Sequence, residues 1–403
     1  MPDAFASSRT PSWFARPAAR SWTCAPAPAD ARDFHASLPG YAPTPLTELP
    51  SLAAELGAGR VFVKDESSRL GLPAFKALGA SWAVRRVLDG RTADGQAADG
   101  QAADGQAADG QAADGPGAAA PMTLVTATDG NHGRAVARTS RLLGQRAHVF
   151  VPHGVHPEAV AAIATEGAEV TRVAGTYDEA VRRAAEAAAA PDAVLVQDTA
   201  WPGYERIPAW IVEGYATLCA EIDVQLALAR AGAPGLVAVP VGVGSLAQAV
   251  VTHYRSRRDG RAPALLAVEP ENAAALAASL AAGRPVTVAT GGTTMAGLNC
   301  GTVSHLAWPV LRDGLDAAVT VTDAESARAA ADLASLGVSS GPCGAASLAG
   351  VRAALTGAGA DGRRAALGLG PASVLVLLST EGPAANPHSI ASDATTSSRD
   401  DRS

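Results

Sequence analysis

The stretch L-V-A-V-P-V-G-V-G-S-L at residues 236–246 is a short apolar run that leads through a glycine turn into a helical pattern. The apolar run 236–240 predicts a buried strand, and the periodicity over 245–254 predicts a helix. The same strand–turn–helix unit recurs along the chain. Further strands are expected at 61–64, 124–127, 148–151, 169–173, 194–197, 265–268, 317–321 and 374–378, and further helices at 133–143, 157–165, 177–190 and 210–228, with another that starts at Lys76.

Apolar strands that alternate with helices are typical of parallel sheets covered on both faces. The sequence therefore predicts an α/β, doubly wound fold with mostly parallel sheets.

The composition of the 403 residues limits the classes of protein to consider. The net charge of −7 argues against a nucleic-acid surface, because such a surface needs clustered Lys and Arg. No run reaches the roughly 20 apolar residues that span a bilayer, and the acidic start Met1–Ala4 lacks the pattern of a signal peptide. The four cysteines are far apart, which predicts a reducing, cytoplasmic compartment and no metal site of zinc-ribbon type.

Lysine is nearly absent from the chain. We count 2 lysines against 30 arginines, and Lys64 and Lys76 stand in one segment. A guanidinium cannot replace an amine that loses its proton and attacks a carbonyl carbon. A biased composition would also leave such a pair by chance, so the count alone keeps both interpretations open.

The chain divides by composition into an arm, two lobes and a tail. Residues 1–34 are rich in Ala, Pro and Ser and are expected to form an irregular arm. Residues 35–75 and 176–388 are expected to form the large lobe, and residues 76–175 the small lobe. The polar residues 389–403 are expected to be a disordered tail.

A repeat of period five occupies residues 89–117, with Asp-Gly-Gln-Ala-Ala as its regular unit. A period of five fits neither the helix nor the strand, and a recurring Asp-Gly opposes helix formation. We therefore expect a flexible surface loop within the small lobe.

Four segments fall where strands end and helices begin, which is where open parallel sheets bind ligands. The first, 65–76, ends in Lys76. At a helix start and beside Phe75, its ammonium would be partly desolvated and near a positive dipole end, and both effects lower its pKa. The alternative is an ordinary solvent-facing lysine at the end of a loop.

The second segment, T-A-T-D-G-N-H-G at 126–133, follows a strand and opens a helix. Its small residues and backbone donors suit an anion, such as a substrate carboxylate near Thr128, and Asn131 suits a phenolic oxygen. Asp129 is an available carboxylate or, alternatively, an N-cap. His132 is interpreted as a packing histidine rather than a catalytic one.

The third and fourth segments follow two other strands. The backbone N–H groups of Gly242-Val243-Gly244-Ser245-Leu246 predict a site for a single phosphate, because the third glycine of a dinucleotide-binding loop is missing. The fourth segment, 378–383, places the hydroxyl of Ser379 at the end of the last strand. There the hydroxyl would face a ring nitrogen without protonating it. The alternative is that the segment is only a turn at the end of the strand.

In this order the four segments resemble those of the fold type II pyridoxal-phosphate-dependent enzymes, which have two doubly wound lobes like tryptophan synthase β. The resemblance spans roughly residues 35–388 and is strongest to the 2,3-diaminopropionate ammonia-lyases. Its most specific part is Asp129 before G-N-H-G, together with Q-D-T-A-W. The segments that carry it are F-H-A-S-L-P-G-Y-A-P-T-P-L (34–46), K-D-E-S-S-R-L-G-L-P-A-F-K (64–76), T-A-T-D-G-N-H-G-R (126–134), Q-D-T-A-W-P-G-Y-E-R-I-P (197–208), M-A-G-L-N-C-G (295–301) and S-T-E-G (379–382).

The resemblance implies a cofactor and a reaction. Lys76 would hold pyridoxal 5'-phosphate as a Schiff base, with residues 242–246, Asn131 and Ser379 as its other ligands. The reaction would be α,β-elimination of 2,3-diaminopropionate, through an aminoacrylate, to pyruvate and two ammonia, a step of amino-acid catabolism.

The resemblance also implies roles for individual side chains. Lys76 and Asp129 would be bases on opposite faces of the substrate, which the acceptance of both enantiomers requires. Asp198 would bind the distal ammonium of the substrate, unless it is only a strand-end turn former, and Thr128 would lie near the substrate carboxylate.

Other interpretations remain open at this point. One is a serine/threonine dehydratase-type lyase with the same cofactor, and another is a cofactor-binding protein without turnover. A nucleotide-binding module would rest on residues 241–246 alone. The expected partner is a small amino acid, with no nucleic acid or membrane, and by analogy the chain forms a homodimer.

Overall fold

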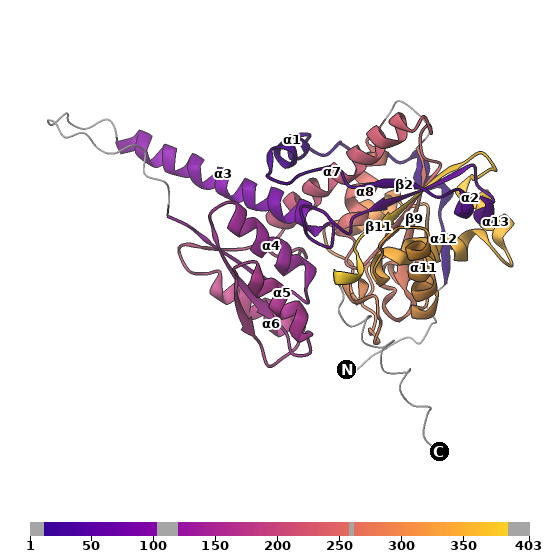
Figure 1. The fold of residues 1–403 in the computed structure, drawn as a ribbon. Helices are drawn as coiled ribbons and strands as arrows, with labels where there is room; N and C mark the ends of the chain where they lie inside the picture. Colours follow the sequence, from indigo (N-terminus) through magenta and orange to yellow (C-terminus); the bar gives the residue numbers. More distant parts are fainter. Residues whose placement is uncertain (1–11, 103–119, 258–261, 386–403) are drawn as a thin grey trace, which may run out of the picture.

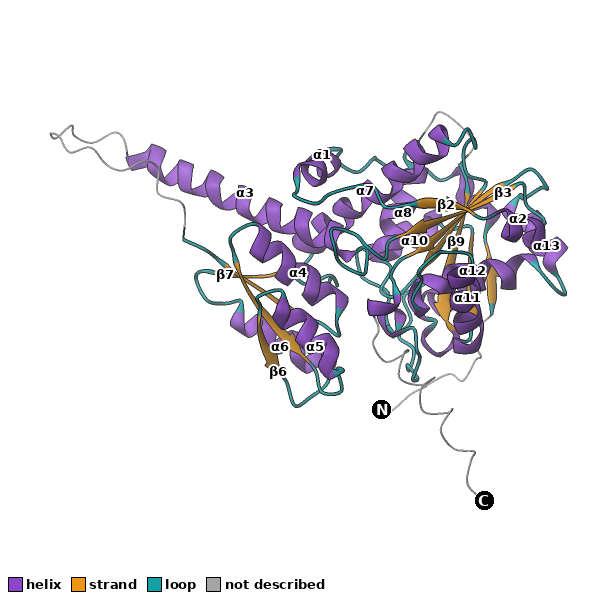
Figure 2. Cartoon of the chain, viewed as in Figure 1, coloured by secondary structure: helices purple, strands orange, loops and turns teal. Residues whose placement is uncertain are grey.

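Two lobes make up the structure, a computed structural model that describes residues 12–102, 120–257 and 262–385. Each lobe contains a β-sheet with helices packed on it (Figure 1, Figure 2). Helix α3 (Lys76–Ala102) packs against α7 (Arg206–Leu228) of the large lobe and α4 (Asn131–Leu142) of the small lobe, so it joins the two. The predicted α/β fold with mostly parallel sheets is confirmed.

The large lobe is built on a seven-stranded sheet with the order β1-β10-β9-β8-β11-β3-β2. The five inner strands are parallel, whereas the short edge strands β1 and β2 are antiparallel to their neighbours. Every residue of β8, β9 and β11 is buried, as in parallel sheets covered on both faces. The strands are β1 (Trp13–Ala15), β2 (Leu46–Glu48), β3 (Arg60–Asp65), β8 (Leu236–Pro240), β9 (Ala264–Pro270), β10 (Ala317–Val321) and β11 (Val374–Ser379).

Side chains of this sheet alternate between two apolar cores. On β11, Val376 and Leu378 pack into one core, and Leu375 and Leu377 pack into the other. The first core is closed by α1 (Asp30–Ser37), α7, α8 (Ser245–Arg255), α9 (Ala275–Ala282) and α10 (Ala307–Gly314), and the second by α2 (Pro50–Leu56), α11 (Asp323–Ser335), α12 (Pro342–Leu355) and α13 (Ala360–Leu367). Short 3-10 turns are η1 (Pro17–Ser21), η2 (Glu271–Ala273), η3 (Ala296–Leu298) and η4 (Pro383–Ala385).

The small lobe has a four-stranded parallel sheet with the order β6-β5-β4-β7. Its elements are α4, β4 (Thr123–Ala127), β5 (Arg146–Val151), α5 (Pro157–Thr165), β6 (Glu169–Arg172), α6 (Tyr177–Ala187) and β7 (Ala193–Leu195). Because β7 pairs with β4, this sheet reaches past residue 175, where the sequence analysis placed the boundary of the lobe.

The first turn of α3 and the middle of α7 approach each other closely at two glycines. A Cβ atom on Gly79 would lie 2.6 Å from Cε1 of Tyr215, and one on Gly214 would lie 2.6 Å from the carbonyl oxygen of Leu78. Any larger residue at either position would push the helices apart. The glycines therefore let α7 hold the beginning of α3, where Lys76 lies.

Most predicted strands and helices are confirmed within two or three residues, but two expectations are wrong. Helix α3 continues through 89–102, because Ala and Gln favour helix and extending an existing helix costs far less than starting one. Residues 103–117 of the repeat, and the tail 389–403, lie outside the described residues. The arm contains β1, η1 and the start of α1, elements too short to give a periodic signal.

No helix within the described residues is both long and apolar enough to cross a membrane. The His, Cys, Asp and Glu side chains of the described ranges also form no group of three that could hold a metal ion.

Candidate active site

A cleft made of two adjoining cavities surrounds Lys76. One has a volume of about 460 Å³ and is lined by the glycine turn before α8, and the other, about 1190 Å³, is lined by the loop before α4. Lys76, Asp198, Val243 and Gly297 line both cavities, so the cavities meet at these residues. Other sequence-predicted residues that line the cleft are Thr128, Asp129, Asn131, Gly242, Gly244, Ser245 and Leu246.

Lys76 is the first residue of α3, and its Nζ donates a hydrogen bond to Oδ2 of Asp198 at 2.6 Å. The chain before it is held by the end of β11, since the N–H of Phe75 donates to the carbonyl of Thr380 at 3.2 Å. The chain after it is held by the packing of Gly79 against α7. Lys76 is therefore fixed from both sides.

The ion pair reverses the protonation that the sequence suggests for Lys76. Burial lowers the pKa of Lys76, but the Asp198 carboxylate outweighs this effect and holds the pKa above its ordinary value. Burial raises the pKa of Asp198, but His132 and Lys76 together hold it well below its ordinary value. The expected low pKa of Lys76 is wrong for the ion-paired state, because its carboxylate partner is 122 residues away in the sequence.

Hydrogen bonds from three directions hold the segment that carries Asp198. Oε1 of the buried Gln197 accepts from the N–H of Ala127 at 3.0 Å, and the N–H of Gln197 donates to the phenolic oxygen of Tyr204 at 2.8 Å. The hydroxyl of Ser245 donates to the carbonyl of Asp198 at 3.2 Å. Asp198 is therefore tied both to the small sheet and to the start of α8.

The glycine turn before α8 presents free backbone donors to the cleft. Gly244 precedes the helix with a φ of +98°, in the left-handed region that favours glycine. The N–H groups of Ser245 and Leu246 belong to the first turn of α8, where no helical carbonyl is available to accept them. Both residues line the cavity next to Lys76, so the turn offers an anion site there.

The space around this turn depends on the absence of side chains. A Cβ atom on Gly242 would lie 2.9 Å from the carbonyl oxygen of Gly297, and one on Gly244 would lie 2.7 Å from Cδ1 of Leu311.

An anion cradle that adjoins a lysine amine fits a cofactor with a phosphate at one end and an aldehyde at the other. The residues present therefore fit pyridoxal phosphate.

The loop before α4 brings Thr128 and Asn131 into the wall of the larger cavity. Oγ1 of Thr128 accepts from the N–H groups of Gly130 at 3.0 Å and Gly133 at 3.1 Å, so this hydroxyl shapes the loop at the helix start. Nδ2 of Asn131 donates to Oε2 of Glu381 at 2.9 Å. The loop thus places the N-terminus of α4 beside the cleft.

Asp129 and His132 differ in burial and in role. Asp129 lines the cleft, and its side chain is exposed overall. The surrounding protein nevertheless removes part of the water near its carboxyl group, which raises the pKa of Asp129, and the charge of Lys76 opposes that rise. His132 is buried, its Nε2 donates to the carbonyl of Val196 at 2.7 Å, and its Nδ1 lies 3.7 Å from Oδ2 of Asp198. Burial lowers the pKa of His132, which favours the neutral ring.

Ser379 is not among the residues that line the two cavities. Its side chain is fully buried and its hydroxyl donates to Oγ of Ser340 at 2.8 Å. The alternation along β11 explains this, because Ser379 shares the strand face of Leu375 and Leu377, which packs against α12. Thr380 lines the cleft instead. A role for Ser379 at a ring nitrogen stays a prediction.

Several residues that line the cleft lie outside the four motif segments. Among them are Tyr177, Tyr215, Gly297 and Cys300. Gly297 and Cys300 belong to M-A-G-L-N-C-G, which entered the sequence analysis only as part of the resemblance. Tyr177 and Tyr215 come from helices that the sequence does not place beside the cleft, and only the folded chain brings them there.

Known proteins resemble this chain in sequence and in fold. The family described as pyridoxal-phosphate dependent enzyme matches residues 37–369. Diaminopropionate ammonia-lyase of Salmonella typhimurium is 38% identical over 299 residues, which cover 73% of this chain and 72% of that protein. The crystal structure of Escherichia coli diaminopropionate ammonia lyase in complex with an aminoacrylate-PLP azomethine reaction intermediate has a TM-score of 0.77 at 33% identity, and the match covers 89% of each chain. The crystal structure of a threonine deaminase from T.th. has a TM-score of 0.67 at 25% identity, and the match covers 89% of this chain and 98% of that one.

The two lysines of the chain allow a direct test of the ion pair. Labelling with [13Cε]lysine gives two side-chain signals, from Lys64 and Lys76, whose titration can be followed by NMR. In the cofactor-free wild type, Lys76 should remain charged up to and beyond the ordinary lysine pKa of about 10.4. We expect Asp198→Asn to lower the pKa of Lys76, because it removes the carboxylate that raises it and leaves the burial that lowers it.

Asp129→Asn is the matched control. The Asp129 carboxylate lines the same cleft but, within the described part of the chain, makes no hydrogen bond to Nζ of Lys76. This variant should change the pKa of Lys76 much less. An unchanged pKa in Asp198→Asn, or an equal fall in both variants, would show that the pair does not set the charge of Lys76.

Proposed function

The chain belongs to the pyridoxal-phosphate-dependent enzymes, and within them to the diaminopropionate ammonia-lyases, and on that premise we propose that it eliminates ammonia from 2,3-diaminopropionate. The overall α,β-elimination consumes one water and yields pyruvate and two ammonia. The observation that carries the proposal is the 2.6 Å contact between the ammonium of Lys76 and Oδ2 of Asp198. In it a carboxylate of the cleft binds a primary alkylammonium, the group that distinguishes diaminopropionate from serine.

Pyridoxal phosphate is the cofactor of this family. When bound it supplies an aldehyde that joins amines and a ring that delocalises the electron pair left at Cα after deprotonation. We assign Lys76 to the aldehyde and the backbone N–H groups of residues 242–246 to the phosphate. Asn131 is assigned as a further ligand because its amide lines the same cleft, and Ser379 on the family resemblance alone.

Asp198 is assigned to the distal ammonium of the substrate. Once the amine of Lys76 is engaged by the cofactor, the Asp198 carboxylate loses the ammonium that now binds it. A desolvated carboxylate without a partner is unfavourable, so the site favours a substrate that brings a second ammonium. Serine and threonine have a hydroxyl at that position and would leave the carboxylate unpaired.

Lys76 and Asp129 are assigned as the two bases that remove the Cα proton from opposite enantiomers. Both line the larger cavity. Desolvation raises the pKa of Asp129, which makes it a better proton acceptor at neutral pH than an ordinary aspartate. Thr128 is assigned to the substrate carboxylate, because the start of α4 beside it offers backbone N–H groups to an anion.

The proposal also covers the compartment and the assembly. We assign the chain to the cytoplasm, because its four cysteines stand far apart in the sequence and include no C-x-x-C pair. A homodimer is assigned by analogy with other fold type II enzymes.

An assay of pyruvate release tests the proposed reaction and its substrate. The chain loaded with pyridoxal phosphate should release pyruvate from D- and L-2,3-diaminopropionate. We expect Asp198→Ala to lower kcat/KM for diaminopropionate by roughly 10- to 100-fold, the equivalent of one charged hydrogen bond. Turnover of serine, which has no second ammonium, should fall far less.

Asp192→Ala is a suitable control, because it removes an exposed carboxylate paired with Arg146 in the same lobe. An Asp198→Ala variant with intact diaminopropionate turnover and improved serine turnover would instead identify a dehydratase-type lyase. Bound cofactor without ammonia release from any diamino or hydroxy acid would identify a binding protein without turnover.

The two-base assignment has its own test. Asp129→Asn keeps the size and polarity of the side chain but removes the base. We expect kcat for one enantiomer of diaminopropionate to fall by about 100-fold or more, the usual worth of a general base, while kcat for the other changes by at most about 3-fold. Equal losses for both enantiomers would exclude Asp129 as the base for one of them.

A further inference from the structure

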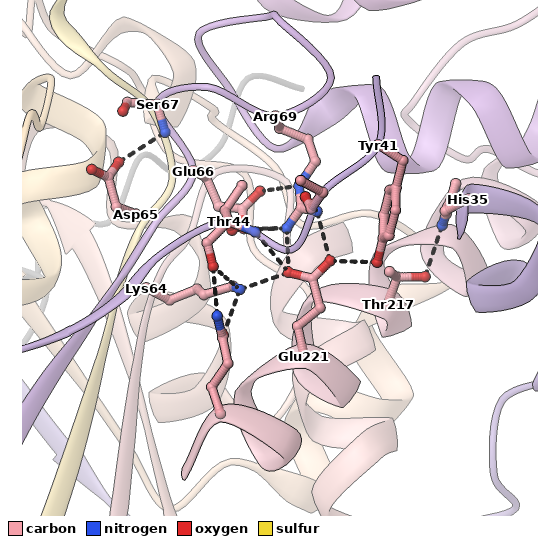
Figure 3. Close-up of polar contacts among 12 residues, drawn as sticks. His35, Tyr41, Thr44, Lys64, Asp65, Glu66, Ser67, Arg69, Thr217 and Glu221 are labelled. Atoms are coloured by element: carbon pink, nitrogen blue, oxygen red, sulfur yellow. Dashed lines mark hydrogen bonds and ion pairs between the residues drawn. The ribbon is translucent and has the colours of Figure 1, made fainter. Parts of the chain in front are cut away.

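Figure 3 shows a group of charged side chains that the proposed reaction does not use. Lys64, Glu66, Arg69 and Glu221, here named the charge cluster, are two cations and two anions whose side chains are at most 3% exposed. Lys64 belongs to β3, Glu66 and Arg69 follow that strand, and Glu221 belongs to α7. Their formal charges cancel.

Each charged end of the cluster has several partners. Nζ of Lys64 donates to the carbonyl of Thr44 at 2.8 Å and to Oε2 of Glu221 at 2.6 Å. The guanidinium of Arg69 donates to both carboxylate oxygens of Glu66 at 2.8 and 2.7 Å. It also donates to both oxygens of Glu221 at 2.7 and 2.8 Å. Arg69 therefore makes two forked bridges, one within its own segment and one to α7.

Stability alone does not account for this cluster. Removing charges from water is costly, and well-packed apolar residues often replace a buried ion pair with no loss of stability. What forked bridges add is geometry, because they hold two segments in a single relative position.

The segment that the cluster holds leads directly to Lys76. Residues 66–75, here named the strap, are tied at both ends to β11. The N–H of Glu66 donates to the carbonyl of the last residue of that strand at 2.9 Å, and the N–H of Phe75 to the next carbonyl at 3.2 Å. Between them Leu70 has a φ of +51°, a conformation that non-glycine residues adopt only where the surroundings impose it. Arg69, the preceding residue, is the one gripped by both carboxylates.

Helix α7 holds the strap and the start of α3 at the same time. Glu221 binds Arg69 at the beginning of the strap. Less than two turns earlier on the same helix, Tyr215 contacts Phe75 at the end of the strap, with ring centroids 4.8 Å apart. Lys76 follows directly, so its position depends on two attachments to one rigid helix.

We propose that the charge cluster is a positioning device that fixes the strap on α7 and thereby sets where the amine of Lys76 lies relative to the phosphate cradle and Asp198. None of its four members is among the residues that line the two cavities of the cleft, so they are positioning residues and not catalytic residues. The inference rests on the proposed function only in that it takes Lys76 as the residue that holds the cofactor.

A charge-neutral double variant tests the proposal. Lys64→Met with Glu221→Gln removes one cation and one anion together, so that Arg69 and Glu66 still pair and no lone charge stays buried. We expect this variant to unfold near the wild-type temperature but to capture pyridoxal phosphate about 10-fold more slowly, as followed by absorbance of the cofactor-free protein mixed with cofactor. We expect kcat to fall by about 10- to 100-fold with KM within about 3-fold, because a misplaced reacting group slows chemistry more than binding.

A second buried pair provides the matched control. Arg255 and Asp316 lie 2.5 Å apart, both fully buried, and neither lines the described cleft. Arg255→Met with Asp316→Asn should change the unfolding temperature without changing the capture rate or kcat. Thr44→Val serves if the first double variant does not fold, since it keeps all four charges and removes only the hydroxyl between Arg69 and Glu66. It should slow cofactor capture less, but measurably.

The outcomes separate this proposal from the proposed function. A folded double variant with the wild-type capture rate and kcat would overturn it. An equal loss of capture rate and kcat in the Arg255/Asp316 control would also overturn it. If the first double variant does not fold, a wild-type capture rate in Thr44→Val would overturn it. A wild-type protein that captures the cofactor at Lys76 but releases no pyruvate would contradict the proposed reaction, and the capture rates would still decide the role of the cluster.

Discussion

The contact on which the rest of the structure depends is the 2.6 Å ion pair between Lys76 and Asp198. It joins parts of the molecule that fold on different sheets, since Lys76 begins a helix packed on α7 of the large lobe and Asp198 follows β7 of the small sheet. The pair keeps both partners charged, and it stands where the two cavities meet. The proposed selectivity has the same physical basis, because a carboxylate that binds one alkylammonium also suits another.

Local signals were sufficient for the parallel strands of both sheets and for most of the cleft, whereas the edge strands β1 and β2 and the helices α1, α2 and α9 to α13 were not predicted. The apolar runs of β8 and β11 and the glycine turn at 242–244 are short-range features, so the sequence alone located them correctly. The rule that open parallel sheets bind ligands at the carboxyl ends of their strands then gathered four distant segments into one site. Residues 128–131 line the cleft for that reason.

What the sequence did not reveal depends on contacts between distant residues. The pKa of Lys76 was expected to be low because the local sequence shows only the start of its own helix, whereas the carboxylate that raises the pKa comes from a segment 122 residues away. The strand end that carries Ser379 was recognised, but the hydrogen bond from its hydroxyl to Ser340, 39 residues away, was not. The bridges between Arg69 and Glu221 were invisible for the same reason, since they join residues 152 positions apart.

The most direct test of the central claim is borohydride reduction of the chain loaded with pyridoxal phosphate, followed by peptide mass mapping. The account predicts one reduced cofactor group, on the peptide that contains Lys76, and none on Lys64, whose side chain is fully buried. Labelling of Lys64 or of the amino terminus, or a Lys76 peptide that remains unmodified, would contradict it.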